Sequence, residues 1–175
     1  MMKFDVRGDI ASARRQFRGK EKQINMAAAR AINRAMTTVR SVATKEIARH
    51  TGITPQRAIR DRLHIRKATP NYLIGEIGAE RYTPNLARFA ARQTKRGVSA
   101  TAWRKRKVYP RTFLGNQGRT VFKRVGKRRL PIRPVWGPKM HAAFVEREVR
   151  RAMDAVARER FRTEFRREVK LRTST

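Results

Sequence analysis

The feature that most constrains this chain is a long segment with many positive charges and no negative ones. From Arg81 to Val145 the sequence has 18 Lys and Arg side chains and no Asp or Glu. Such a segment cannot form ion pairs within itself, so its cations must face water, a polyanion or the acidic groups of another chain. Surfaces that serve only solubility normally mix both signs. The segment is therefore expected to be one half of an interface.

The flanking regions are basic too, but they mix the signs. The whole chain of 175 residues has 45 Lys and Arg against 13 Asp and Glu, a formal charge of +32. Residues 1–80 hold 17 cations and 7 carboxylates, and residues 146–175 hold 10 and 6. A free chain with this charge repels itself, so a compact state is favoured by anionic partners or neighbouring subunits. The apolar fraction of 39% still allows a modest core, which excludes full disorder.

Several classes of protein are excluded by what the sequence lacks. The chain has no Cys, which removes disulfides, thiolate zinc sites and cysteine nucleophiles. No apolar run approaches the ~20 residues that a membrane helix needs. The first residues, Met1 to Val6, contain no apolar signal core. We therefore expect synthesis in the cytoplasm of the producing cell and no membrane partner.

The N-terminal part shows the apolar spacing of amphipathic helices. Residues 9–49 carry an Ala-rich stripe at helical spacing, which permits close backbone approach to a packing partner. Gly19 is expected to divide this region into a short helix and a long one, and Gly52 to end the long one. A short helix is predicted over residues 55–63, with Thr54 as its N-cap and the proline at its first position.

The C-terminal part predicts one further long helix over residues 139–171, opened by Gly137 and Pro138. Its apolar stripe alternates with charged side chains that we place on the outer side. On that side, charged residues three or four positions apart mostly combine opposite charges. Glu164 and Glu168 are the exception, because both are negative.

Between the helical parts the apolar spacing changes to two residues, which is typical of strands. Strands are expected at residues 64–68, 72–77, 85–89, 98–105, 113–114, 120–125 and, as an extended Pro-rich stretch, 130–136. The predicted fold class is α+β, in which long N- and C-terminal helices pack on a small antiparallel sheet with long basic loops. We expect a single domain, helical over residues 9–63, with the sheet and basic loops over 64–136 and the last helix over 139–171.

The sequence gives little support for catalysis. Its three histidines, His50, His64 and His141, lack the spacing of a helical metal site and are interpreted as surface or helix-end residues. The serines lack a nucleophile-elbow context, and carboxylates are absent from the loop-rich middle where active sites are usually built. We predict no catalytic residue, no metal and no cofactor. A DNA-processing enzyme is disfavoured because it needs carboxylates for its metal ions.

The basic runs predict the functional surface. The residues expected to contact a polyanion such as DNA, or an acidic partner, are Arg104, Lys105, Arg106, Lys107, Lys123, Arg124, Lys127, Arg128 and Arg129. Three aromatic residues, Trp103, Tyr109 and Phe122, lie beside these runs and are suited to stacking on bases. We favour packing or subunit contact for them. No sequence-reading nucleic-acid motif appears, so contact with DNA is expected to involve phosphates without sequence specificity.

The order of short motifs along the chain resembles the minor tail protein Z family of long-tailed bacteriophages, also called tail completion proteins. The motifs are the Ala28–Arg34 segment of the Ala-rich helix, then Thr51–Ile53 and Ile59–Ile65, and late in the chain Gly118–Arg124 and Arg129–Pro138. The late segment, Leu-Pro-Ile followed by Gly-Pro after a basic aromatic strand, is the most specific of them. The depth of the basic charge is not required by this resemblance.

The resemblance implies a structural virion protein at the head-proximal end of the tail. There it would complete the tail and join it to the head connector at the neck, as a ring of copies that is commonly sixfold, beside tail tube and tail terminator proteins. DNA in the channel would be a further contact. Residues expected in packing or subunit contact are Val135, Trp136, Phe144 and Val145. The alternative is a ribosomal-type RNA-binding structural protein, which shares the size and charge.

Overall fold

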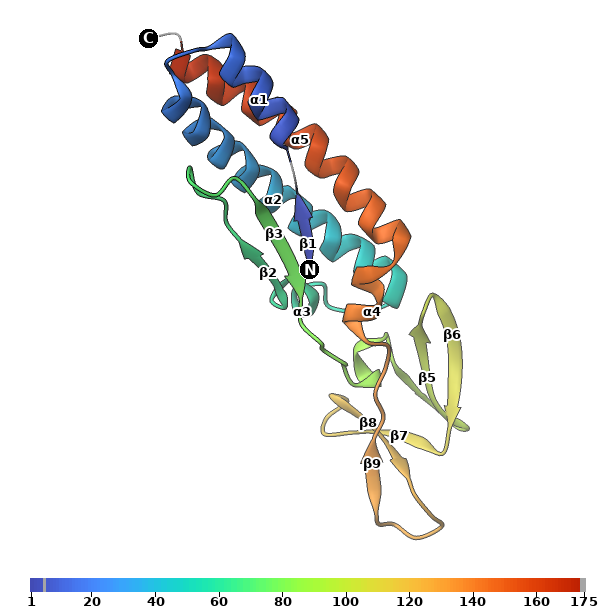
Figure 1. Cartoon of the computed structure of the whole chain (residues 1–175). Helices are drawn as coiled ribbons and strands as arrows, with labels where there is room; N and C mark the ends of the chain where they lie inside the picture. The colour runs from blue at the N-terminus through green and yellow to red at the C-terminus, as the bar shows by residue number, and fades with distance from the viewer. Residues whose placement is uncertain (5, 174–175) are drawn as a thin grey trace. The chain divides into compact units, whose positions relative to one another are not determined.

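The computed structural model of the chain describes residues 1–4 and 6–173, whose contacts group into two compact units. Unit 1 consists of residues 1–43, 63–79 and 147–175, and unit 2 of residues 44–62 and 80–146. Figure 1 shows the helices and strands of both. The α+β fold class is confirmed, with long helices near both ends of the chain. The assignment of all 175 residues to a single domain stays a prediction.

Unit 1 combines long helices with a three-stranded antiparallel sheet (Figure 1). Its helices are α1 (Arg7–Gln16), the larger part of α2 (Glu21–Thr51) and α5 (Arg147–Thr173). Its sheet has the order β1-β3-β2, with β1 at Met2–Phe4, β3 at Gly75–Ala79 and β2 at Leu63–Arg66. The sequence analysis missed β1. Its Phe4 is buried and packs edge-to-face on Phe161 of α5, with the ring centroids 5.9 Å apart.

The Ala-rich stripe of α2 forms the centre of this core, as the sequence predicts. Ala28, Ala31 and Ala35 are fully buried. The sheet comes so close to the helix that a Cβ on Gly75 of β3 would lie 2.7 Å from the side chain of Ile32. Small residues on both elements therefore permit an approach that larger side chains would prevent.

The predicted ends of the N-terminal helices are confirmed, and the predicted C-terminal helix is corrected. Gly19 lies just beyond α1 and Gly52 just beyond α2. Both adopt the left-handed backbone conformation, with φ values of +84° and +82°. The helix expected over residues 139–171 is two helices, α4 (Met140–Val145) in unit 2 and α5 in unit 1. The break lies at Glu146, whose ψ of 140° is extended, so α4 ends there.

Unit 2 contains two antiparallel sheets of three strands each, ordered β4-β5-β6 and β7-β8-β9. The strands are β4 (Arg92–Thr94), β5 (Gly97–Ala102), β6 (Lys105–Pro110), β7 (Thr112–Gly115), β8 (Thr120–Arg124) and β9 (Ile132–Pro134). The described chain thus has three small sheets where the sequence predicted one. The strand expected over residues 98–105 ends at Ala102, because Trp103 and Arg104 form a two-residue turn with φ values of +52° and +62°.

Two further expectations for unit 2 are wrong. Residues 85–89 form a 3-10 turn (Leu86–Arg88) instead of a strand, because the side chain of Asn85 accepts a hydrogen bond from the Ala87 N–H and thereby caps the turn. The helix expected over residues 55–63 is only α3 (Arg57–Arg60). Thr54 does not cap it, since its N–H and its hydroxyl both donate to the carbonyl of Arg88, at 2.7 and 3.1 Å.

Candidate polyanion-binding surface

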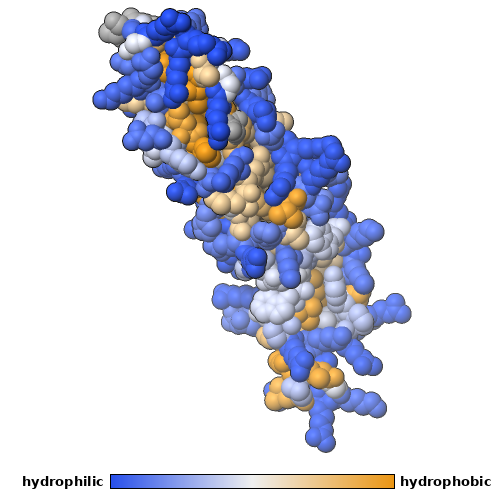
Figure 2. All heavy atoms as spheres, in the orientation of Figure 1, coloured by the Kyte–Doolittle hydropathy of each residue, from blue (hydrophilic) through white to orange (hydrophobic). Residues whose placement is uncertain are grey.

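The acid-free segment lies wholly within unit 2, and all of its 18 cations are exposed. Within residues 1–4 and 6–173, no Lys or Arg of this segment forms an ion pair, because every ion pair there has its cation elsewhere. Figure 2 shows long hydrophilic side chains standing out from the surface of this unit. Unit 2 therefore presents a basic surface whose counter-charges must come from outside it.

The first predicted basic run lies on the hairpin of β5 and β6. Arg104 is in the turn, and Lys105 to Lys107 begin β6. Successive strand residues point to opposite faces, so Lys105 and Lys107 share one face while Arg106 takes the other. The guanidinium of Arg106 donates to the hydroxyl of Ser99 at 3.3 Å and to the carbonyl of Ala90 at 3.4 Å. Arg106 thus supports the sheet, and the other three side chains extend into solvent.

The second predicted group lies on the hairpin of β8 and β9. Lys123 stands directly opposite Arg133 across the two strands, which places like charges side by side. The guanidinium of Arg124 lies over the ring of Phe113, 5.2 Å from its centroid. Lys127, Arg128 and Arg129 occupy the connecting loop and are all exposed.

The two sheets of unit 2 meet at a groove of about 350 Å³ that collects cations from three connecting segments and from the end of β8. Its five cationic residues are Lys95, Arg96, Arg111, Arg124 and Lys127, and no carboxylate lines it. Sequence reasoning selected Arg124 and Lys127 and missed the other three. The turn signal Thr-Lys-Arg-Gly at residues 94–97 is the pattern that would have pointed to Lys95 and Arg96.

The floor of this groove is held by hydrogen bonds between the sheets. The hydroxyl of Thr112 donates to the Tyr109 carbonyl at 2.6 Å and accepts from the N–H of Val98 at 2.9 Å. The side-chain oxygen of Gln93 accepts from the Leu114 N–H at 2.9 Å. Gly97 has a φ of +144°, and a Cβ there would collide with the carbonyl of Tyr109. These side-chain-to-backbone hydrogen bonds, with the close approach at Gly97, hold in place the strands from which the cations project.

The four residues predicted for packing or subunit contact lie in different surroundings. Phe144 is fully buried in the core of unit 2. Val135 is half-buried, and its backbone joins Leu86 and Val121 by hydrogen bonds of 2.8 and 2.9 Å. The side chains of Trp136 and Val145 are 59% and 41% exposed. A role in subunit contact stays a prediction for all four.

The aromatic residues beside the basic runs differ among themselves. Phe122 and Tyr109 are half-buried, and Phe122 packs on Phe113 at 5.9 Å between ring centroids. Trp103 is 41% exposed and meets His50 edge-to-face at 5.8 Å. Packing is therefore confirmed for Phe122, whereas Trp103 is not a core residue.

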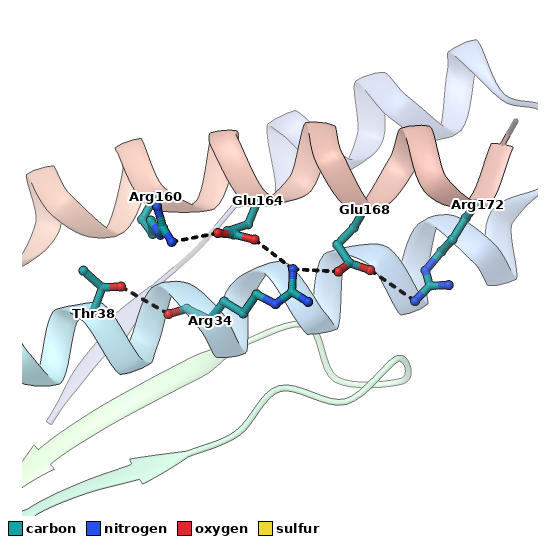
Figure 3. Close-up of polar contacts among 6 residues, drawn as sticks. All are labelled: Arg34, Thr38, Arg160, Glu164, Glu168 and Arg172. Atoms are coloured by element: carbon teal, nitrogen blue, oxygen red, sulfur yellow. Dashed lines mark hydrogen bonds and ion pairs between the residues drawn. The ribbon is translucent and has the colours of Figure 1, made fainter.

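Unit 1 contains buried ion-pair clusters, and one of them corrects the sequence analysis. Glu164 and Glu168 of α5 are buried against α2 and do not lie on the outer side. Figure 3 shows Arg34 of α2 reaching both carboxylates, at 2.9 Å to Glu164 and 2.8 Å to Glu168. Arg160 and Arg172 complete the cluster at 2.9 and 3.2 Å. The like-charge pair is therefore stable because cations bridge it.

The titration of this cluster follows from the same contacts. The hydrogen bond from Arg34 holds the pKa of Glu164 below its ordinary value, although burial acts in the opposite direction. The same hydrogen bond raises the pKa of Arg34. Both groups therefore stay charged at neutral pH, and the cluster is a structural ion-pair network of unit 1.

Within the part of the chain that the structure describes, no three His, Asp or Glu side chains come together as a metal site. Among the same residues, no helix combines the length and apolar character that crossing a bilayer requires.

The family model for the prophage minor tail protein Z matches residues 10–174, nearly the full chain. The chain belongs to this family. Minor tail protein Z is a structural component of phage tails, and its family is not one of known enzymes. No curated protein and no solved structure matches the chain significantly. The resemblance read from the sequence motifs is thereby confirmed at the level of the family.

Proposed function

We propose that this protein completes the head-proximal end of the tail and joins it to the head connector. In this proposal it acts without catalysis, as one of several copies in a ring, commonly sixfold, in contact with the tail tube, the tail terminator and the connector. It is made in the host cytoplasm and resides in the neck of the virion. Membership of a tail protein family supports this function and disfavours the ribosomal alternative.

One observation carries the proposal beyond the family: the 18 exposed cations of the acid-free segment have no ion-pair partner within the described residues. Leaving so many like charges close together destabilises the free chain. The arrangement is favourable where an external polyanion or acidic protein neutralises it. The neck offers both, since it holds DNA in its channel and surrounds each subunit with other proteins.

The nine residues of the two predicted basic runs are the proposed contacts with DNA phosphates or acidic neighbours. The guanidinium of Arg106 is less available to an anion than the other side chains, because it already donates hydrogen bonds to Ser99 and Ala90. Contact with phosphates would position DNA without reading its sequence.

Electron microscopy of purified tails tests the location. Tails assembled with a tagged copy of the protein are labelled with antibody-coated gold, and tails from a strain that lacks the protein are the control. We expect gold at the head-proximal end and tails without the protein that fail to join heads. Gold along the tube or at the distal tip, or normal joining without the protein, would contradict the proposal.

A further inference from the structure

We propose that the groove between the two sheets of unit 2 is the principal phosphate-binding site of this protein, and that it seats the backbone of DNA. This inference rests on the DNA contact in the proposed function and assigns that contact to five residues. They are Lys95, Arg96, Arg111, Arg124 and Lys127. Three of them lie outside the basic runs that the sequence singles out.

The charge of the groove favours a phosphate backbone. Cations from three connecting segments and from the end of β8 line one cavity of about 350 Å³, and no carboxylate lines it. The larger groove of about 620 Å³ in unit 1 is different, since its Asp9 pairs with Arg162 at 3.8 Å and its lining includes Phe17 and Phe165. A second cavity of unit 2, of about 490 Å³, is lined by two cations, Arg81 and Lys139. The groove between the two sheets of unit 2 combines a concave shape with five cations from several elements and no carboxylate. That combination suits a chain of closely spaced anions.

The groove is also pre-organised. Hydrogen bonds of Thr112 and Gln93 hold the two sheets together beneath it. The ring of Phe113 supports the guanidinium of Arg124. Arg111 has a left-handed φ of +58°, an uncommon conformation for a non-glycine residue that places it at the corner between β6 and β7. Because the supporting backbone is fixed before binding, little backbone entropy is lost when a ligand binds.

The other basic elements are less suited to phosphates. At the β8–β9 loop, Val125 and Leu130 are 54% and 65% exposed on either side of the cations. Aliphatic side chains gain nothing from a phosphate but are stabilised by an apolar recess on a protein. On the β5–β6 hairpin, Arg106 is already engaged. Of these three basic elements, the groove is therefore the best suited to a phosphate backbone.

The test measures binding of the full-length protein to a short fluorescent duplex of mixed sequence over a range of salt concentrations. The groove variant is Arg96→Gln with Lys127→Gln, two exposed loop side chains. The matched control is Arg88→Gln with Arg119→Gln, which removes the same charge from exposed sites of unit 2 outside the groove. Circular dichroism establishes that each variant is folded as the wild type is.

For the groove variant we expect the slope of log Kobs against log salt to become shallower by about 2 and affinity at about 0.1 M salt to fall about tenfold. The control pair should change the slope by much less. A groove variant that binds like the control, in a protein whose wild type binds strongly, would overturn the groove and leave the proposed DNA contact intact. A wild type that does not bind the duplex at low salt would overturn both.

Competition separates phosphates from acidic protein. Inorganic polyphosphate should displace the duplex from the wild type far better than polyglutamate of equal charge, and this preference should shrink in the groove variant. Equal displacement by the two polymers would instead identify the groove as a contact for an acidic protein surface, against the inference.

Discussion

The two units of this protein differ in how far they compensate their positive charge. Unit 1 has 22 Lys and Arg against 9 Asp and Glu, and its buried carboxylates are bridged by cations, as Arg34 bridges Glu164 and Glu168. Unit 2 has 23 against 4, and the 18 cations of its acid-free segment are exposed and unpaired within the described residues. Unit 1 thus pairs part of its charge internally, whereas the acid-free segment of unit 2 has no counter-charge among the described residues.

Both tryptophans, Trp103 and Trp136, lie in unit 2, and the longest helices belong mostly to unit 1. Tryptophan fluorescence therefore follows unit 2 alone, while circular dichroism at 222 nm follows mainly unit 1. The two signals allow the stability of each unit to be measured in the same sample, and each prediction below uses this separation.

The largest effect is expected from Arg34→Met. The substitution leaves Glu164 and Glu168 facing each other in a buried position without their shared cation. We expect the melting temperature of the dichroism signal to fall by about 5–10 °C, discounted for the partial exposure of Arg34. The control Arg30→Met, an exposed cation one turn earlier on α2, should shift it little. Equal shifts in the two variants would show that the cluster does not stabilise unit 1.

Acid should weaken unit 1 before it weakens unit 2. The folded pKa of Glu164 lies below the ordinary value of 4.5 because of the Arg34 hydrogen bond. A lowered pKa gives stability that is complete above pH 4.5 and is lost as the pH falls below that value toward the folded pKa. The dichroism midpoint should therefore drop steeply below about pH 4.5, and less steeply in Arg34→Met. An identical acid dependence in the two proteins would contradict this assignment.

Salt should act with opposite sign on the two units. Screening reduces the repulsion among the cations of unit 2 and weakens the ion pairs of unit 1. Between low salt and about 0.5 M, we expect the fluorescence midpoint to rise by about 3 °C while the dichroism midpoint stays level or falls. Parallel changes in both signals would indicate that charge repulsion destabilises unit 2 no more than it destabilises unit 1.

The smallest effect is a gain in stability. Arg133→Glu converts the like-charge pair with Lys123 across β8 and β9 into an opposite-charge pair. Such a change is worth about 0.5 kcal/mol, and the fluorescence midpoint should rise accordingly. Arg129→Glu, in the loop and without a cross-strand partner, should give a smaller rise. A fall on Arg133→Glu would mean that repulsion across these strands is negligible.

Much of unit 1 was predictable because its determinants are local in sequence. The Ala-rich stripe of α2 is spaced for one helix face, and Gly19 marks the place where the backbone turns left-handed between α1 and α2. The burial of Glu164 was not predictable, because its partner Arg34 lies 130 residues away and only folding brings them together. A pattern of charges on one helix does not reveal a cation supplied by another.

The same reasoning explains the partial success in unit 2. The basic runs, including Arg124 and Lys127, stand out as continuous stretches of sequence. Lys95, Arg96 and Arg111 do not, because they come from separate turns that meet only when β4 to β9 form two sheets. Sequence therefore locates positive charge, but the three-dimensional fold is needed to show which charges share one cavity.

The central claim is that the basic surface of unit 2 is half of an interface that the assembled tail completes. Lysine labelling with an amine-reactive reagent, read by mass spectrometry, tests it directly in the free protein and in intact virions. Lys95, Lys105, Lys107, Lys123 and Lys127 should react freely in the isolated protein and become protected in virions. Two exposed lysines of unit 1, Lys22 and Lys67, should lose less reactivity. Unit 2 lysines that react equally in both samples would contradict the account.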